Sequence, residues 1–529
     1  MQYFTTYFFH DLDIHIAHML IGAIILTLIY EFINGFHDTA NSVTTVIYTC
    51  ALKAKLAVIM SSLFNFLGVI LSGLSVAYTI IYLLPINLLS ESNVTHYLAM
   101  IFSMLLAAII WNLGTWYFGL PASSSHTLIG TIIGIGIINA LITNNSIIKT
   151  LNTSKLIEII ISLIISPIIG LILGGLITSL LYLSLNNKKK EHYIHLTPSE
   201  KKKKDGKRQP AFWPRVALII SAAGVSFSHG ANDGQKGIGL IMLILIGVIP
   251  ETFMVNLNAN GYEIKSTQIA IYHLQEYYNQ HSDKITKFFE NYNNQIMEMT
   301  KTNKTAYCPL HYFSKKNDNN ITLHKQTQIQ NIHNDQDKII NNINIITSLL
   351  KDIHDYNQIS PMERSHVRNI LIYLANITDQ ISKIPETSNM EKHMLHNIHK
   401  NLLITVEYAP MWIIIAVAIS LSLGTIIGWR RITSTIGEKI GKKEMTYAQG
   451  LSAQITTGIS ISIASYTGIP MSTTHILSSA VTGTMIAHGY GLQSKTIKNI
   501  LLTWILTLPI AISLTGILYW FFLKYILNT

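Results

Sequence analysis

The chain has little charge and almost no cysteine. Only 12% of its 529 residues are Asp, Glu, Lys or Arg, whereas an average soluble domain has about 25%. This deficit, together with 49% hydrophobic residues, argues against a soluble protein and indicates an integral membrane protein. With Cys50 and Cys308 alone, the sequence predicts neither a disulfide framework nor a cysteine-based metal site.

Basic residues are also missing where a signal peptide would need them. No Lys or Arg precedes the first apolar run, and two Asp residues stand there, so we expect this segment to stay in the mature protein. The net charge of +10 comes from short segments between apolar runs. This pattern is typical of the cytoplasmic loops of a membrane protein, and we expect no nucleic-acid partner.

Apolar runs of about the length that spans a bilayer are abundant. Lipid cannot satisfy exposed backbone groups, so these runs are expected to be helices. We therefore predict an all-α polytopic membrane protein, with spans at about 17–50, 57–84, 98–118, 121–140, 156–184, 214–250, 408–429, 446–466, 470–488 and 497–527.

Two polar segments divide the chain. Residues 186–213 contain KKK, KKKK and KR and are predicted to be a basic cytoplasmic linker. Residues 251–406 are rich in Asn, Gln and His and are predicted to be a mostly helical extramembrane insert, without metal-ligand spacing. The membrane part then consists of a first transmembrane repeat, the start of a second repeat and its remainder: 1–185, 214–250 and 407–529.

The basic segments also predict the topology. They follow the apolar runs at 17–50, 156–184 and 408–429. Placing these segments in the cytoplasm puts every basic linker on one side of the membrane. The N-terminus, the C-terminus and the insert 251–406 are then expected on the outer, periplasmic side of a bacterial inner membrane.

Two pairs of motifs predict that the chain contains two related halves. GLPASSSHTL (119–128) and GIPMSTTHIL (468–477) share Gly-x-Pro-x-Ser, two hydroxyl residues and a His. NGFHDTANSV (34–43) and HGANDGQKGI (229–238) share a Gly with an Asp three positions later, within a long apolar run.

The spacing of the motifs supports this duplication. Asp38 and Ser123 are 85 residues apart, whereas Asp233 and Ser472 are 239 residues apart. The difference of 154 nearly equals the 156 residues of the insert 251–406. Because the first half starts outside and the second inside, we expect inverted-topology repeats, which are typical of secondary transporters with a midplane substrate site.

The two Asp residues are candidates for cation or proton coupling. A buried Asp in the middle of a membrane helix costs about 2.5–3.5 kcal/mol, so Asp38 and Asp233 should face a cavity, an ion or a partner. The glycines around them predict broken helices. Freed N–H groups would favour an anion, and freed carbonyls with a carboxylate would favour a cation or a proton.

The hydroxyl motifs are candidates for binding an oxyanion. Each follows a Pro, which suits the first turn of a helix, so each predicts a helical hairpin with Ser or Thr at its tip. Clustered hydroxyls and unpaired helix N–H groups offer donors to a tetrahedral anion, although small residues also serve helix packing. These hydroxyls belong to Ser123, Ser124, Ser125, Ser472, Thr473 and Thr474.

Histidines accompany all four motifs. Imidazoles titrate near neutral pH, so His37, His126, His229 and His475 are candidate proton carriers as well as structural hydrogen-bonding residues. Glu31, which precedes the first motif, is a further candidate for proton handling.

The four motifs closely resemble those of the PiT inorganic phosphate transporters, nearest to the low-affinity bacterial Pit-type proteins. The resemblance covers nearly the whole chain and implies phosphate symport, with phosphate crossing as a neutral complex with Mg²⁺ or another divalent metal. It places Asn41 and Asn232 with the two Asp residues. It also implies that these amides and the six hydroxyls bind phosphate.

One departure from the family pattern concerns the coupling ion. Lys236 stands where the family has Asn, and His37 stands where the first motif usually has another Asn. An ammonium offers only donors and repels a second cation, so Lys236 argues against a sodium site. Its charge would pair with Asp233 or face the phosphate. We therefore expect proton coupling, with Asp38, Asp233, Lys236 and His37 as the coupling residues.

Other interpretations stay open at this stage. Sodium-coupled phosphate symport and symport of another tetrahedral oxyanion such as sulfate would use the same architecture. An enzyme is disfavoured because GQKGIG lacks the spacing of a P-loop. No covalent cofactor and no resident metal are expected, and the expected partners are phosphate, protons, divalent cations and the lipid bilayer, with a homodimer as a possible assembly.

Overall fold

The computed structural model describes residues 12–84, 94–142, 151–185, 191–285, 326–385 and 387–525. Every regular element within these ranges is a helix, and the one strand-like contact there is an isolated bridge between Gly441 and Leu492. The prediction of an all-α protein is therefore confirmed. The chain forms two compact units, Met1–Val248 with Ala409–Thr529, and Ile249–Tyr408.

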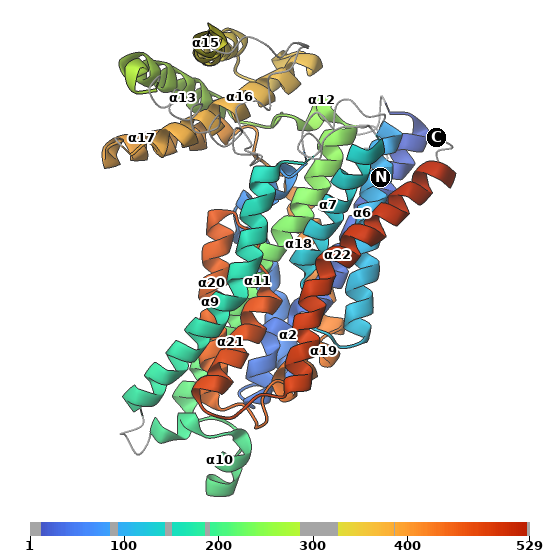
Figure 1. Ribbon diagram of the computed structural model, residues 1–529, viewed down its shortest axis with the longest axis vertical. Coiled ribbons are helices and arrows are strands. Elements are labelled where there is room, and N and C mark those ends of the chain that lie inside the picture. Colours follow the sequence, from blue (N-terminus) through green and yellow to red (C-terminus); the bar gives the residue numbers. More distant parts are fainter. Residues whose placement is uncertain are drawn as a thin grey trace. The chain divides into compact units, whose positions relative to one another are not determined.

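The first unit is a bundle of long helices (Figure 1). Its first half contains α2 (Ile14–Tyr48), α3 (Ala54–Leu71), α4 (Ser75–Ile81), α6 (Val94–Tyr117), α7 (Ser124–Ile142) and α9 (Thr153–Leu185). The connecting segment contains η1 (Glu191–His195) and α10 (Pro198–Asp205). The second half contains α11 (Phe212–Val248), α18 (Met411–Ile427), α19 (Arg430–Glu438), α20 (Tyr447–Thr467), α21 (Thr473–Ala487) and α22 (Ser494–Tyr525).

Several of these helices can cross a membrane by length and composition. Six of the described helices qualify, α2, α3, α6, α7, α9 and α22, and the pair α18 and α19, bent by 64°, would make a seventh. The chain is thus a multi-pass membrane protein. The predicted spans in α11, α20 and α21 do not pass the same test. With 15 residues α21 is shorter than a span requires, α20 contains many hydroxyl residues, and α11 contains Asp233 and Lys236 within its apolar run.

The prediction that the glycine-rich motifs break their helices is wrong. Both α2 and α11 are continuous through Asp38 and Asp233. The breaks lie instead in the next element of each half, between α3 and α4 around Gly73, and between α18 and α19 after Gly428. The predicted single span at 57–84 is therefore two helices. Backbone groups at the two Asp residues stay within the helical hydrogen-bond ladder and are not free for a ligand.

Glycines in α2 and α18 let these two helices touch. A Cβ on Gly35 would lie 2.1 Å from the carbonyl oxygen of Leu421, and a Cβ on Gly424 would lie 2.0 Å from that of Phe32. Both distances are far shorter than a real Cβ contact. The first helix of the first half therefore packs against the second helix of the second half, at a distance that only glycine permits.

The mirror contact joins α11 and α3. A Cβ on Gly230 would lie 2.2 Å from the carbonyl oxygen of Asn65, and a Cβ on Gly68 would lie 2.2 Å from that of Phe227. The glycine of each Asp motif thus serves close packing rather than a helix break. The two halves exchange contacts in matching pairs, and α9 packs on α21 as α22 packs on α7 (Figure 1).

The short helices α4 and α19 hold the hairpin turns of the opposite half. Thr79 Oγ1 donates to the carbonyl of Gly468 at 2.8 Å, and Thr435 Oγ1 donates to the carbonyl of Gly119 at 2.8 Å. Gly468 and Gly119 have φ angles of +75° and +66°, a left-handed conformation that favours glycine. Each hairpin turn is therefore hydrogen-bonded to a short helix of the other half.

The second unit, Ile249–Tyr408, is helical as well. Its elements are α12 (Pro250–Phe253), α13 (Gly261–Gln280), α15 (Gln326–Leu350), η3 (Tyr356–Gln358), α16 (Pro361–Ser382) and α17 (Asn389–Leu403). Arg368 is fully buried there, and its Nη1 donates to the carbonyls of Met254 at 2.9 Å and Val406 at 2.7 Å. The guanidinium thus joins the two ends of this unit.

Local sequence explains where five helices begin. Each starts with a Ser, Thr or Asn followed three residues later by Glu or Gln, the pattern in which each side chain caps the other residue's backbone N–H. The structure shows both hydrogen bonds in every case: Thr197 and Glu200 before α10, Asn260 and Glu263 before α13, Ser360 and Glu363 before α16, Ser388 and Glu391 before α17, and Thr446 and Gln449 before α20.

Candidate functional site

The two buried aspartates meet at one hydroxyl. Ser124, the first residue of α7, places its Oγ 2.8 Å from Asp38 Oδ2 and 3.3 Å from Asp233 Oδ2. Asp38 and Asp233 come from α2 and α11, so this contact joins the first helices of both halves to the tip of the first hairpin. All three side chains are buried.

A second set of contacts crosses between the halves in a matching pattern. Asn41, three residues after Asp38, donates through Nδ2 to Thr474 Oγ1 of the second hairpin at 2.9 Å. Lys236, three residues after Asp233, donates through Nζ to Ser125 Oγ of the first hairpin at 2.6 Å. Each first helix thus bonds the hairpin of the opposite half through the residue three positions after its Asp.

The two halves differ in what satisfies each carboxylate. Asp38 Oδ1 accepts a hydrogen bond from Thr474 Oγ1 at 2.9 Å. Asp233 Oδ1 pairs instead with Lys236 Nζ at 2.8 Å. Of the two alternatives that the sequence left open for Lys236, the structure shows the ion pair with Asp233. The Lys236 ammonium also donates to Ser125 Oγ, one of the hydroxyls predicted to bind phosphate.

Histidines and amides extend this network on both sides. His37 Nδ1 lies 2.9 Å from Asp38 Oδ1, and its Nε2 lies 3.3 Å from Thr115 Oγ1. His229 Nε2 lies 3.6 Å from Asp233 Oδ2, and its Nδ1 lies 3.1 Å from the Asn65 side-chain oxygen. Each carboxylate therefore has one imidazole beside it.

The serine before each hairpin arm has a local role. Ser123 Oγ accepts from the backbone N–H of His126 at 3.1 Å, and Ser472 Oγ accepts from that of His475 at 3.2 Å. Both are helix-capping contacts. The arms begin at Ser124 and Thr473, so the hydroxyl motifs lie at their N-termini, as the sequence predicted.

The structure thus gathers most, but not all, of the predicted site residues. Those joined in one hydrogen-bonded network are Asp38, Asp233, Lys236, His37, Asn41, Ser124, Ser125, Thr473 and Thr474. Asn232 donates to the carbonyl of Ile469 at 3.3 Å and lies apart from this network. The Oδ1 atoms of Asn41 and Asn232 are buried and have no hydrogen-bond partner among the described residues.

A small cation could be held within this network. One ligand atom each of Asp38, His229 and Asp233 lies within 4.8 Å of the others. Two carboxylates and an imidazole suit a small cation or a shared proton. The Lys236 ammonium already supplies one positive charge to this set.

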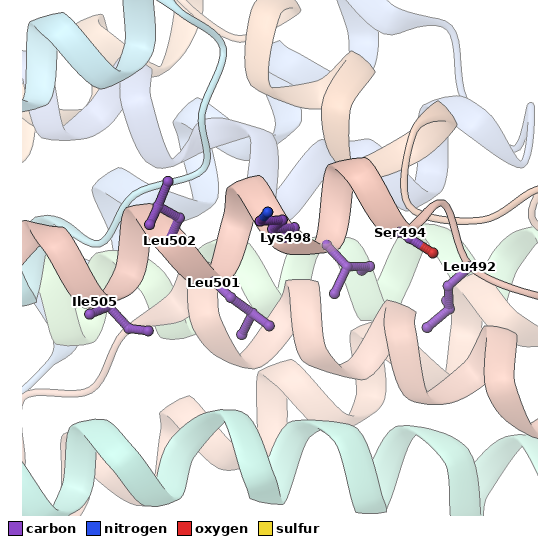
Figure 2. Close-up of a pocket in the computed structure, with 7 residues that line it drawn as sticks. Leu492, Ser494, Lys498, Leu501, Leu502 and Ile505 are labelled. Carbon is purple, nitrogen blue, oxygen red and sulfur yellow. The ribbon is translucent and has the colours of Figure 1, made fainter.

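A separate apolar hollow of about 440 Å³ lies along α22. Figure 2 shows its labelled lining, which includes Leu492, Ser494, Lys498, Leu501, Leu502 and Ile505. None of the network residues lines it. Its aliphatic walls suit hydrocarbon chains rather than phosphate, so the hollow does not compete with the network as the substrate site.

Two residues that contact the histidines beside the carboxylates were not identified from the sequence. Asn65 binds His229 and also donates to Thr425 Oγ1 at 2.9 Å, and Thr115 binds His37. The available signal was an amide in the middle of the apolar run 57–84, because a buried amide needs a partner. Thr115 gives no such signal, since Thr in membrane helices commonly bonds its own backbone.

Comparisons with known proteins show the family to which this chain belongs. The sequence profile of the "Phosphate transporter family" matches residues 34–515. The chain is 50% identical over 519 residues to the low-affinity inorganic phosphate transporter PitA of Escherichia coli K12, covering 98% of this chain and 99% of that protein. It is 51% identical over 508 residues to the low-affinity inorganic phosphate transporter of Buchnera aphidicola subsp. Acyrthosiphon pisum, covering 96% and 97% of the two chains.

One solved structure shares the fold. It is described as the sodium-dependent phosphate transporter and aligns with a TM-score of 0.51 at 19% sequence identity. The alignment covers 96% of this chain and 100% of the other. At this identity the likeness supports the helical architecture and says nothing about the coupling ion.

Proposed function

Because this chain belongs to the phosphate transporter family, we propose that it takes up inorganic phosphate by symport with protons, at a site between its two halves. The family membership confirms the resemblance that the four motifs indicated, and the chain is a transporter rather than an enzyme. The observation that carries the proposal is the Ser124 hydroxyl between Asp38 and Asp233, because it joins both halves at one buried point.

The chemistry around this point suits phosphate. The N-termini of α7 and α21 bring Ser124, Ser125, Thr473 and Thr474 together, and hydroxyls at helix N-termini are donors to a tetrahedral oxyanion. Phosphate would take these donors from the carboxylates that now accept them. The Asn41 and Asn232 oxygens, for which the described residues supply no partner, would accept from a protonated phosphate oxygen.

Lys236 favours protons over sodium. Its ammonium lies 2.8 Å from Asp233 Oδ1, so one carboxylate that a sodium ion would need is already neutralised. A second cation beside an ammonium is repelled. Phosphate would then travel as a protonated species or as a neutral complex with Mg²⁺ or another divalent metal, which is substrate and not a resident cofactor.

The matching contacts between the halves support inverted repeats around a midplane site. The α2–α18 contact and the α11–α3 contact use glycines at equivalent positions. On this proposal the protein lies in a bacterial inner membrane, and its termini and the unit Ile249–Tyr408 lie in the periplasm.

The test is uptake of labelled phosphate by the purified full-length chain in proteoliposomes. We expect accumulation when an inward proton gradient is imposed, a further increase with Mg²⁺, and competition by arsenate but not sulfate. Dependence on a sodium gradient with no response to a proton gradient would overturn proton coupling. The Asp233→Asn variant should insert in the membrane and lose accumulation, and wild-type accumulation by this variant would remove Asp233 from the mechanism.

A further inference from the structure

A buried carboxyl lies two helical turns before Asp38 and has no role in the transport proposed so far. Glu31 is on α2 and has no exposed surface. Its Oε2 accepts one long hydrogen bond, 3.3 Å from Asn34 Nδ2, and its Oε1 has no hydrogen-bond partner in the described part of the chain. The neighbouring Tyr30 hydroxyl is likewise buried and without a partner there.

A glycine of the opposite half makes room for this carboxyl. A Cβ on Gly237 would lie 2.4 Å from Glu31 Cγ and 2.8 Å from Glu31 Oε1, so a larger residue at this position of α11 would displace the Glu31 side chain. Gly237 directly follows Lys236, the residue that pairs with Asp233. The Glu31 side chain therefore lies against the backbone of the helix turn that carries the ion pair.

This arrangement occurs in one half only. Counting from the two Asp residues, the position that corresponds to Glu31 is Ser226, which bonds Ser61 Oγ at 3.0 Å. The position that corresponds to Gly237 is Ser42. Lys236 is also without a counterpart, since Asn41 stands at its equivalent position. The two halves therefore differ at this contact between α2 and α11: Glu31 adds an acid on α2, and Lys236 adds a base on α11.

Glu31 has charged neighbours but forms no salt bridge with any residue in the described ranges. The charged groups that act on it are Asp38 on α2 and Asp233 and Lys236 on α11. No residue of α18, which also packs along α2, is ionisable. Titratable residues of the other helices on α2 are Lys55 on α3, His96, Tyr97 and Tyr117 on α6, Arg430, Arg431 and Glu438 on α19, Tyr447 and Tyr466 on α20, and His475 on α21.

A buried carboxylate without a cationic partner loses its hydration and gains little in return, so the neutral acid is the cheaper form in this closed arrangement. We propose that Glu31 carries the proton that is coupled to phosphate uptake. The acid O–H bond breaks when the contact with Gly237 opens to water on one side, and the proton passes to water. The carboxylate then takes a proton from hydronium on the other side. This inference rests on the proton symport proposed above.

The test separates driven uptake from exchange, using the full-length protein in proteoliposomes. Glu31→Gln mimics the neutral acid permanently. Uptake driven by a proton gradient should therefore fall by roughly a hundredfold, while exchange of internal for external phosphate stays near the wild-type rate and becomes independent of pH. Glu31→Asp should recover part of the driven uptake. The matched control is Glu158→Gln, which removes an exposed acid of α9 paired with Lys155 and should change neither rate.

The outcomes distinguish the two proposals. If the wild type responds only to a sodium gradient, the proposed proton symport fails and the role of Glu31 fails with it. If the wild type responds to protons and Glu31→Gln accumulates phosphate equally well, only the inference about Glu31 is overturned. A parallel loss of exchange and driven uptake in Glu31→Gln, with no recovery in Glu31→Asp and a lowered melting temperature, would assign Glu31 to the fold and also overturn the inference.

Discussion

The two halves of the membrane unit have the same framework and different charges. Each half contributes an Asp on a continuous first helix, a glycine three residues before it that touches the opposite half, and a hairpin with hydroxyls at its tip. Only the second half adds Lys236, and only the first adds Glu31. The framework thus explains how the halves fit together, and the proposed proton coupling rests on the differences between them.

The largest expected effect comes from removing the charge that distinguishes the second half. Lys236→Met leaves Asp233 as a buried carboxylate without its ammonium partner, which should lower the free energy of unfolding by about 3–5 kcal/mol. Asn41→Leu, at the equivalent position of the first half, removes neutral hydrogen bonds to Thr473 and Thr474 and should cost about 2 kcal/mol. Thermal unfolding of the purified variants in detergent measures both. Equal losses would contradict the assigned ion pair.

The framework itself can be tested at the close helix contacts. Gly230→Ala forces a Cβ toward the Asn65 carbonyl oxygen and should destabilise the protein by about 1–3 kcal/mol, and Gly35→Ala should do the same on α2. Gly224→Ala is the matched control, because a Cβ at this position of α11 meets no atom within 4 Å. The control should be neutral or slightly stabilising, since Ala favours helix. Similar melting temperatures for Gly230→Ala and Gly224→Ala would refute the tight contact.

The hydroxyl between the two carboxylates should affect transport more than its counterpart. Ser124→Ala removes the hydroxyl whose single proton is shared between the Asp38 and Asp233 carboxylates, whereas Thr473→Val removes only one acceptor of Asn41, 3.2 Å away. Hydrogen bonds to charged groups are worth about 1.5–3 kcal/mol. Initial phosphate uptake should therefore fall by roughly tenfold or more in Ser124→Ala and by less in Thr473→Val. The reverse order would show that the serine is not central to the site.

The smallest effects are expected at the short helices, and here the halves should behave alike. Thr79→Val and Thr435→Val each remove one hydroxyl bond to a hairpin glycine carbonyl, both 2.8 Å long. Each should lower the free energy of unfolding by about 1 kcal/mol. Differential scanning measurements on the two variants should give nearly the same shift in melting temperature. A large difference between them would reveal an asymmetry that these contacts do not show.

Composition and motif repetition predicted the class of the protein well. Scarce charge and long apolar runs indicated a helical membrane protein, and the duplicated motifs named most of the residues that the structure joins around Asp38 and Asp233. The helix breaks were misplaced because glycine has two uses in a membrane helix. The sequence of one helix does not tell whether a glycine such as Gly230 relaxes its backbone or admits a neighbour.

The sequence by itself determined that buried polar side chains occur in the membrane in two symmetric sets, because burying them without partners is too costly. Only the tertiary structure decided which partners they have. Asp38 accepts from Ser124, 86 positions away, and from Thr474, 436 positions away, and Lys236 donates to Ser125, 111 positions away. Propensity and periodicity act over a few residues, whereas these contacts depend on how the helices of the two halves pack against each other.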